Sequence, residues 1–458
     1  MDAIACDHRA RTRRLRGLVV ALASGCLVAG CSVAVASPTP TATPPSPTPQ
    51  SSLAQLTPSP TPSPTQTPTL TALSSVGPAP AGKWTGIRWI SAGSVFPQTP
   101  VPDGGDQSSV QISVFGWSRG YVGFRTAITQ TLSDAGLGSE KFVMVSTASP
   151  DGLHWTSGKA LGAGEDTGSW VFMSAVVEGP AGLLAVGRNP AGTCGGPATV
   201  GAMWTSPDGL TWTRVQPPSD FAAASVYTVD AGSAGYIATG TLKDGVTPAV
   251  WVSADGRSWR RTTLPKPASG SILVDGATAF AGGYVISGAQ RLDIGCGMSE
   301  FVPSLWWSSD GKSWTSGNLS GAMPAGDAWV TVNRISDHAL MAIAQGWDAT
   351  GLVSSQQIWF TGDGQTWKLV KSPSGLLNAN VLTNGQRGLM AVHQTNGYGP
   401  PTVATVNDDL TVTILSQSGD GPVDSDTSNQ WMSAFGPTGV VILSVDGLNL
   451  WLGVPTAS

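Results

Sequence analysis

A short pattern built on an Asp-Gly turn recurs along this chain and constrains the fold more than any other feature. Four copies read Trp-x-Ser/Thr-x-Asp-Gly-x-Ser/Thr-Trp, and they start at Trp204, Trp251, Trp306 and Trp359. A related fifth copy runs from Ser149 to Trp155. Self-similarity at a period of about fifty residues indicates stacked units, each too small to bury a core by itself. The sequence therefore predicts a repeat architecture.

One unit shows the expected strand plan. Four strands are expected in succession, at Ser225–Ala231, Tyr236–Leu242, Ala249–Ala254 and Ser258–Leu264. Asp-Gly between the last two is a strong hairpin signal, because Gly takes positive φ without a Cβ clash. The Asp carboxylate can accept local backbone N–H groups, and the Ser or Thr two residues earlier can brace the same turn. The flanking Trp side chains should wedge between neighbouring sheets.

A second landmark gives the number of units. A Gly before a short apolar run recurs at Gly120, Gly182, Gly235, Gly283, Gly388 and Gly439, and Asp337 to Leu340 fills the gap. The mean spacing of about 53 residues suits a four-stranded propeller blade. Trp431 to Pro455 supplies only three strands, with Trp451 at the Trp position of the third, whereas Lys83 to Trp89 is typical of an outer strand. We therefore predict an all-β fold: a seven-bladed β-propeller of four-stranded antiparallel blades, closed by an N-terminal strand joining the C-terminal blade.

The first thirty-one residues are typical of an export signal. Five Arg residues between Arg9 and Arg16 precede the uncharged, mostly apolar stretch Gly17–Gly30. That stretch is shorter than the roughly 20 residues of a spanning helix. Leu27-Val28-Ala29-Gly30-Cys31 resembles the bacterial lipobox, which implies cleavage before Cys31 and diacylation of its thiol. We expect residues 1–31 to be a lipoprotein signal peptide that leaves the chain anchored to the cell membrane on its extracytoplasmic face; an ordinary cleaved signal peptide is the alternative.

Residues 32–82 form a separate compositional segment. They carry no charge and are rich in Pro, Thr and Ser. Such a segment cannot bury apolar area and favours extended polyproline II, so we expect a disordered stalk here and the propeller over 83–458. Within the propeller, Cys194 and Cys296 could pair in an oxidising compartment if their Cα atoms come within about 7 Å. Two free thiols are the alternative.

Charge and histidine content exclude several classes of function. Only 12% of the residues are charged and the formal net charge is -5, with no basic run, which argues against nucleic-acid binding. His154, His338 and His393 are isolated, and no His/Cys cluster has metal-ligand spacing. We therefore expect no metal and no cofactor.

The repeated box is similar to the Asp-box (BNR) repeat of sialidases and of many other exported propellers. Its carboxylates are Asp151, Asp208, Asp255, Asp310 and Asp363. The box departs from the sialidase form because Gly follows Asp directly, one residue earlier. Photosystem II assembly factors of the same propeller type carry similar repeats. The resemblance implies a structural turn on the rim away from the ligand face, and so it specifies fold rather than chemistry.

Binding is expected on the opposite rim, where the connections between second and third strands are long. These loops are Thr126–Glu140, Arg188–Gly201, Ala289–Pro303, Gly346–Ser355 and His393–Pro401. Their candidate ligand-binding residues are Trp347, Tyr398, Arg291 and Glu300. Trp170, Trp329 and Trp431 stand where inner strands begin. These three could stack on sugar rings or anchor a protein, although packing between blades is the favoured alternative.

A hydrolase of the sialidase type would need an Arg cluster, a Tyr nucleophile with a Glu base, and an acidic proton donor. The available set is Arg125, Arg291, Arg387, Tyr398 and Glu300, and the family's Arg-Ile-Pro motif is reduced to Arg125-Thr126-Ala127. We therefore assign no catalytic residues. The sequence predicts a lipid-anchored binding or scaffold module for a glycan or protein ligand. The alternatives are an exo-sialidase-type glycoside hydrolase and an assembly factor of a membrane complex, resembling the photosystem II assembly propellers.

Overall fold

The computed structural model describes most of the chain beyond residue 82. The described ranges are 82–93, 107–133, 136–161, 172–190, 199–216, 218–295, 298–319, 328–347, 353–370, 380–383, 388–392, 402–407, 409–419, 431–444 and 449–457, with 76, 78–80, 376, 421 and 422. Within these ranges the chain is built of strands, with a single four-residue helix. The predicted all-β class is confirmed.

The strands follow one another along the chain as four-stranded antiparallel units. The units are numbered in chain order from the one that contains β2, because β1 belongs to the last unit. Unit 1 contains β2 (Gln107–Trp117), β3 (Gly120–Ser133), β4 (Gly136–Ser149) and β5 (Thr156–Leu161). Unit 2 contains β6 (Phe172–Gly179), β7 (Gly182–Pro190), β8 (Thr199–Ser206) and β9 (Thr213–Val215). Helix α2 (Ser219–Ala222) leads into unit 3, which contains β10 (Ser225–Gly232), β11 (Gly235–Thr241), β12 (Pro248–Ser253) and β13 (Trp259–Thr262).

The remaining units repeat this plan. Unit 4 contains β14 (Ser271–Phe280), β15 (Gly283–Gly295), β16 (Met298–Ser308) and β17 (Thr315–Leu319). Unit 5 contains β18 (Ala328–Ser336), β19 (Ala339–Trp347), β20 (Val353–Thr361) and β21 (Thr366–Val370). Unit 6 contains β22 (Asn380–Thr383), β23 (Gly388–Val392), β24 (Thr402–Val406) and β25 (Val412–Ile414). Unit 7 contains β27 (Trp431–Phe435), β28 (Val440–Ser444), β29 (Leu450–Ala457) and β1 (Trp84–Gly93).

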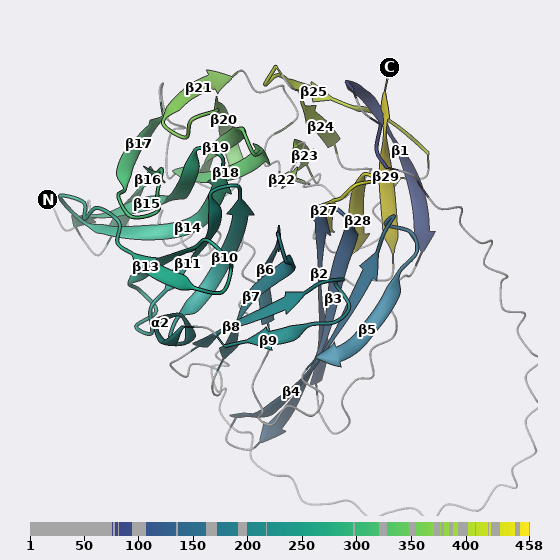
Figure 1. Cartoon of the computed structure of the whole chain (residues 1–458), viewed down its shortest axis with the longest axis horizontal. Coiled ribbons are helices and arrows are strands. Elements are labelled where there is room, and N and C mark those ends of the chain that lie inside the picture. The colour runs from purple at the N-terminus through teal and green to yellow at the C-terminus, as the bar shows by residue number, and fades with distance from the viewer. Residues whose placement is uncertain are drawn as a thin grey trace, which may run out of the picture.

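The N-terminal strand completes the last unit, as the sequence predicts. Strand β1 pairs antiparallel with β29 from Trp84↔Ala457 to Gly93↔Leu450. Figure 1 shows β1 beside β29, and the units following one another around a central axis. Trp84 and Trp451 belong to the same apolar cluster. The two ends of the repeat array are therefore joined by backbone hydrogen bonds, which removes the open edges of a linear array.

The prediction of seven separate blades is wrong, because the strands of the described ranges form six hydrogen-bonded sheets. The outer strands β17 and β21 pair in parallel at Asn318↔Thr366 and Leu319↔Trp367, so units 4 and 5 share one eight-stranded sheet. Strand β26 (Ser416–Gly419) likewise pairs in parallel with β1 and adds a fifth strand to unit 7. In both places an exposed outer edge offers unpaired N–H and C=O groups, and a neighbouring segment satisfies them.

Apolar side chains fill the space between successive units. The first Trp of each complete box, at Trp204, Trp251, Trp306 and Trp359, is at most 5% exposed. Each lies in a cluster with residues of the preceding unit; Trp251, for example, packs with Val186 and Met203. A cluster of this kind joins every successive pair of units in the described part of the chain, including unit 7 to unit 1. The predicted wedging of Trp between sheets is confirmed.

Each Asp-Gly box is a turn stabilised by its own side chains, as the Asp255 box illustrates. Asp255 Oδ1 accepts the N–H groups of Arg257 and Ser258 at 2.8 and 2.7 Å. Ser253 Oγ accepts Gly256 N–H at 2.9 Å and donates to Asp255 Oδ1 at 3.0 Å. The box glycines have φ between +65° and +81°. In the degenerate box of unit 6, Val406 to Val412, Asp409 stands at the glycine position, and the next residue, Leu410, has φ +62°, a conformation that strains a residue with a Cβ.

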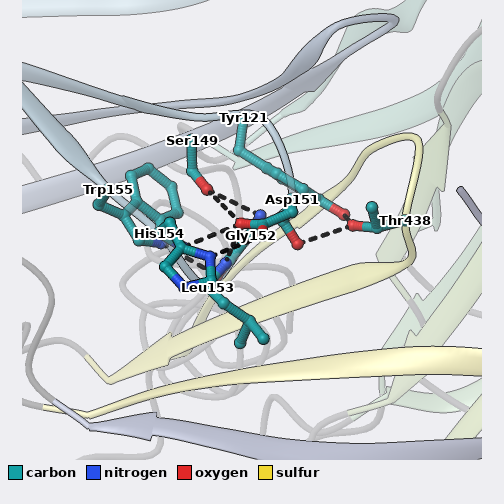
Figure 2. Close-up of polar contacts among 8 residues, drawn as sticks. All are labelled: Tyr121, Ser149, Asp151, Gly152, Leu153, His154, Trp155 and Thr438. Atoms are coloured by element: carbon teal, nitrogen blue, oxygen red, sulfur yellow. Dashed lines mark hydrogen bonds and ion pairs between the residues drawn. The ribbon is translucent and has the colours of Figure 1, made fainter. Parts of the chain in front are cut away.

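The first box also fastens unit 1 to unit 7 (Figure 2). Thr438, in the β27–β28 turn, donates its hydroxyl to the Asp151 carbonyl at 3.0 Å. The Tyr121 hydroxyl donates to the Gly439 carbonyl at 2.6 Å and lies 2.9 Å from Thr438 Oγ1. Burial alone would raise the pKa of Asp151, but hydrogen bonds from the His154 N–H and ring outweigh it and lower that pKa. Polar contacts therefore reinforce the apolar contact where the ring closes.

The antiparallel order defines two rims. The box face holds the first-to-second turns and the Asp-Gly turns, and the loop face holds the second-to-third connections and the starts of the inner strands. The chain before β1 passes along the box face, where Ala79 N–H donates to the Pro437 carbonyl at 2.7 Å and Trp84 Nε1 donates to the Pro80 carbonyl at 2.7 Å. The loop face is therefore opposite the rim at which the N-terminal segment arrives.

The box carboxylates predict a defined loss of stability in acid. Burial of Asp363 would raise its pKa, but the Thr366 and Gln365 N–H groups lower the pKa to about 2. A folded-state pKa below the unfolded value of about 3.9 stabilises the fold above that value, and the contribution is lost as pH falls through about 2. We expect the urea midpoint of Asp363→Asn to fall less steeply than that of wild type between about pH 4 and 2. The exposed Glu300→Gln variant is the control, and parallel slopes for all three proteins would contradict this account.

Candidate functional site

The loop face is where the structure gathers varied side chains. Ser271, at the start of β14, pairs with Arg291 near the end of β15, and Ala328 pairs with Gly346 in the same way. The inner-strand starts and the second-to-third connections therefore share one rim, which confirms the predicted placement. Box turns are alike from unit to unit, whereas these connections differ in length, so this rim is where specificity can be encoded.

Two of the predicted irregular loops are β-hairpins. The Thr126–Glu140 segment belongs largely to β3 and β4, which pair as far as Gln130↔Glu140 and Ser133↔Gly136. The Ala289–Pro303 segment belongs to β15 and β16, which pair beyond Leu292↔Glu300. The prediction of irregular loops at these places is wrong, because alternate residues of each segment continue the cross-strand ladder. Parts of the Arg188–Gly201 and Gly346–Ser355 loops, and all of His393–Pro401, lie outside the described residues.

Unit 3 differs from unit 4 because the connection between its second and third strands is short. Strands β11 and β12 are joined by a tight turn in which Asp244 Oδ1 accepts the N–H groups of Val246 and Thr247 at 3.0 and 2.8 Å. Val246 is 71% exposed. The β15–β16 hairpin of unit 4 thus extends beyond the adjacent unit 3 on this rim.

Arg291 and Glu300 are both exposed on the β15–β16 hairpin, but on opposite faces of it. Arg291 pairs with Phe301, and Glu300 pairs with Leu292. Directly paired residues project to the same face of an antiparallel ladder, and neighbours along a strand alternate. Arg291 therefore shares a face with Phe301, and Glu300 does not. The hairpin does not present the two charges together to one ligand group.

Trp329 and Trp347 are both half-buried on unit 5. Trp329, at the start of β18, packs against Phe301 of unit 4 with ring centroids 6.2 Å apart and planes at 54°. The favoured prediction for Trp329, packing between blades, is confirmed, although part of its surface stays accessible. Trp347 ends β19 and pairs with Val353.

The other predicted residues are either distributed around the ring or not described. Arg125 is half-buried in β3 of unit 1, whereas Arg291 belongs to unit 4, so the structure does not assemble them as neighbours. Trp431 begins β27 opposite Ser444, with its side chain outside the described residues. Also outside them are Cys31, Trp170, Cys194, Cys296, Arg387 and Tyr398.

Sequence reasoning missed a set of bulges on the inner strands. The extra residue is Ser174 in β6, Tyr227 in β10 and Asp275 in β14, each five residues before the end of its strand. Three consecutive units thus interrupt their inner strands at one equivalent level. A bulge leaves one residue unpaired and re-aims its side chain, and bulges are common beside binding sites. Tyr227 uses its hydroxyl to contact Thr241 Oγ1 at 2.8 Å, at the loop-face end of β11.

A glycine opposite each bulge makes it possible. Gly187, Gly240 and Gly288 pair with the residue just before the bulge. A Cβ on Gly240 would lie 1.9 Å from the Ser225 carbonyl oxygen, and one on Gly288 would lie 2.0 Å from that of Leu273. Units 1 and 5 carry Arg125 and Ala344 at this position, and their inner strands pair there without a bulge. The sequence signal that could have predicted these bulges is therefore a glycine five residues after the start of the second strand of a unit.

Asp275 is the most unusual of the bulged residues. Asp275 is half-buried, and its burial raises the pKa of the carboxyl, offset only in part by the Trp329 indole. That Trp329 Nε1–H faces Asp275 without completing a hydrogen bond, so the buried indole nitrogen has no partner among the described residues. The Trp329 indole is thus a buried donor without a partner in the described part of the chain, which native interiors rarely tolerate.

A second half-buried acid shows the contrast. Asp230, near the box-face end of β10, has Oδ1 3.6 Å from Arg334 Nη2, and its Oδ2 accepts the Ala279 N–H at 2.9 Å. Burial raises the pKa of Asp230, and Arg334 acts against that rise. Asp230 therefore has a counter-charge from unit 5 and a donor from unit 4. It serves to join units 3, 4 and 5, whereas Asp275 has no equivalent partner.

Across the described ranges, no group of three or more His, Cys, Asp or Glu side chains is arranged to hold a metal ion. No helix in the described part of the chain is long and apolar enough to cross a membrane.

Comparison with known proteins gives only distant likenesses. No family model matches the sequence, and no curated protein does. Among solved structures, the family 117 glycoside hydrolase Zg3597 of Zobellia galactanivorans is 9% identical, over 61% of this chain and 92% of its own, with a TM-score of 0.32. The NanB sialidase of Streptococcus pneumoniae is 12% identical over 79% and 70%, with a TM-score of 0.36. The fucose-specific lectin of Aleuria aurantia is 12% identical over 70% and 97%, with a TM-score of 0.35. Likenesses this weak carry no argument about function, and the propeller-like architecture is established here by the strand pairing itself.

The bulges depend on their glycines, which gives a direct test. We expect Gly240→Ala to lower the free energy of unfolding by about 3 kcal/mol, because its Cβ would overlap backbone atoms that cannot move aside. Gly276→Ala is the matched control: its Cβ would meet only Ser287 Oγ, at 3.1 Å, so a change within about 1 kcal/mol is expected. Urea unfolding measures both. Equal effects would show that the β10 bulge does not require a glycine.

Proposed function

We propose that this protein is an exported, lipid-anchored propeller that binds a ligand on its loop face and performs no catalysis. The ligand is a glycan or a protein surface. The observation that carries the proposal is the half-buried Trp329–Phe301 ring pair, whose indole N–H has no partner among the described residues, on the rim opposite the structural boxes. Half-buried aromatic rings next to a buried polar group are characteristic of small-ligand sites on rigid scaffolds.

The repeat plan supports a ring that works as one rigid platform. We propose that the four-stranded units, two of which share one sheet, surround a single axis. The apolar clusters between successive units, including unit 7 with unit 1, favour this interpretation. A rigid ring holds the inner-strand starts of units 3, 4 and 5 in fixed relation, which is what a preorganised site requires.

Binding is favoured over hydrolysis by the distribution of charges. Glycoside hydrolysis commonly needs two carboxyl groups about 5–9.5 Å apart across the scissile bond. Near Trp329, Asp275 is half-buried, but Glu300 is exposed on the face of its hairpin away from Phe301. Arg125 and Arg291 belong to different, non-adjacent units. These placements do not favour a sialidase-type cluster.

The N-terminal features support anchorage with the loop face outward. The Cys31 lipobox and the uncharged stalk provide the anchor and the spacer in this proposal. The contacts of Ala79 and Trp84 bring the N-terminal segment in at the box face. A tether attached there leaves the loop face free to meet ligands.

Binding and anchorage can be tested separately. We expect the purified protein to bind at least one class of oligosaccharide on a glycan panel, and Trp329→Ala to weaken binding by about tenfold or more because stacking area is lost. Val246→Ala, on the same face, is the matched control and should bind as wild type. In cells, Cys31→Ser should release the protein from the membrane fraction without changing its glycan binding.

Three outcomes would contradict the proposal. Turnover of a fluorogenic sialoside that is abolished in Tyr398→Phe would establish the hydrolase alternative. Retention of Cys31→Ser in the membrane fraction would rule out the lipid anchor. Absence of glycan binding together with stoichiometric co-purification of one membrane protein would favour the assembly factor.

A further inference from the structure

We infer that the Asp151–His154 pair of the first Asp-Gly box is a pH-sensitive clasp on the seam, the interface between units 7 and 1. Protonation of the His154 imidazole tightens the seam, and loss of that proton loosens it. The inference goes beyond the proposed function and does not depend on it. It starts from a box that differs from the other four in both its carboxylate and the side chain that holds it.

Asp151 is the only buried carboxylate among the five boxes, and it is 6% exposed. The exposed carboxylates of the other boxes are Asp208, Asp255, Asp310 and Asp363. The difference comes from unit 7, because a Cβ on Gly152 would lie 3.0 Å from Val441 and 3.1 Å from Leu452. Leu153 packs into the same apolar cluster. The first box therefore lies at the seam itself.

The first box also replaces a neutral donor by a titratable one. In the second and third boxes, the hydroxyls of Thr211 and Ser258 donate to Oδ2 of the box carboxylate at 3.2 and 3.1 Å. His154 takes this position in the first box, and its Nδ1 lies 2.7 Å from Asp151 Oδ2. The His154 side chain is 49% exposed, so its ring can exchange protons with water. Histidine titrates between pH 5 and 8, whereas a hydroxyl does not.

The pair acts on the seam through the backbone of Asp151. The carbonyl of this same residue accepts the Thr438 hydroxyl of unit 7 at 3.0 Å (Figure 2). Asp151 Oδ1 also accepts the N–H groups of Leu153 and His154, both at 2.9 Å, so the carboxylate fixes the turn that carries the carbonyl. A tighter contact with His154 therefore restrains the group to which unit 7 is bound. Unit 7 contains β1, so the clasp lies on the unit that closes the ring.

Protonation changes the strength of this contact. A neutral imidazole can still donate one N–H group, but a protonated one forms a charge-assisted bond that is roughly twice as strong. Burial acts to raise the pKa of Asp151, and the hydrogen bonds and charge of His154 outweigh it and lower that pKa. A cation that gains a carboxylate partner on folding stabilises the fold fully below its unfolded pKa, about 6.5 for histidine, and the contribution is lost as the cation gives up its proton at higher pH.

The elements packed against the pair add few charged groups. Strands β27, β28 and β29 and the Gly436–Gly439 turn contain no charged residue. Tyr121 on β3 stays protonated, because burial raises its pKa. Arg119, in the β2–β3 turn, donates to the Pro207 carbonyl of unit 2 instead. The charged residues on the strands of unit 1 lie beyond the Thr147↔Ser157 pair, towards the loop face: Arg125, Glu140, Lys141 and Lys159. The pH dependence of the seam is therefore assigned to His154.

Amide hydrogen exchange tests the clasp directly. After correction for intrinsic exchange rates, peptides from β2 and β27 of the purified protein should exchange about two- to fivefold faster at pH 8 than at pH 5.5, whereas peptides from β11 and β12 should not. His154→Ser, which restores a hydroxyl, should remove the difference at the seam. Ser258→His is the matched control, because it places an imidazole beside the exposed Asp255 of unit 3. Its seam peptides should keep the wild-type difference.

A second variant keeps the test decisive if His154→Ser does not fold. Asp151→Asn retains an Oδ1 acceptor for the turn but removes the charge, so it should also lose the pH difference at the seam. A difference that persists in either variant would overturn the inference, and so would an equal difference in the β11 and β12 peptides. Slower exchange of the seam peptides at pH 8 than at pH 5.5 would contradict the predicted direction.

Discussion

The structure depends on indole rings packed between neighbouring sheets. A single four-stranded sheet of this size cannot cover both of its faces, so each unit is stable only against the next. Trp251 and Trp359 are fully buried in this way. Burying 150–250 Å² of each ring corresponds to a gross stabilisation of about 4–6 kcal/mol, which is an upper bound against an extended chain. Because the packing has to continue from unit to unit, the array is stable when it closes on itself, and β1 completes that closure beside β29.

The same arrangement separates the two rims by chemistry. On the box face the carboxylates are occupied by their own turns, as Asp255 and Asp363 illustrate. The N–H groups that donate to these carboxylates lower their pKa values, so the carboxylates serve to stabilise the turns. On the loop face, Trp329 packs against Phe301, and its buried indole N–H has no partner among the described residues. The contrast between carboxylates held by their own turns and a buried donor left without a partner is the main physical reason to place recognition on the loop face.

The sequence predicts the periodic part of the fold well. Trp spacing and Asp-Gly turns depend on local rules, and Trp84 could be matched to Trp451 because both keep the repeat pattern. The β17–β21 pairing was not predictable, because nothing in the local sequence at Asn318 and Leu319 indicates which strand they pair with. The hairpin at Ala289–Pro303 was assigned to a loop because its polar residues conceal a ladder in which Gln290 faces Val302.

The candidate site was predicted only in part. Trp329 was identified from its place at an inner-strand start, but Asp275 was not, because its significance comes from burial beside a residue of the next unit. A local signal did exist at Gly240 and Gly288, which recur at one position of the second strand and accompany the bulges. Recognising it requires knowing that a glycine in a strand often marks a bulge or a close backbone approach.

Closure of the ring by the N-terminal strand is the central claim, and a designed cross-link tests it most directly. Arg88 pairs with Val454, and the Cα atoms of such antiparallel partners lie about 4.5–5.5 Å apart, within the range that a disulfide spans. In the Arg88→Cys/Val454→Cys variant, mass spectrometry of the non-reduced, proteolysed monomer should find the two engineered cysteines joined within one chain. The Arg88→Cys/Leu264→Cys control, which places the second cysteine in the segment after unit 3, should give no such peptide. Absence of the 88–454 link in a folded monomer, or its formation only between chains, would contradict the closed ring.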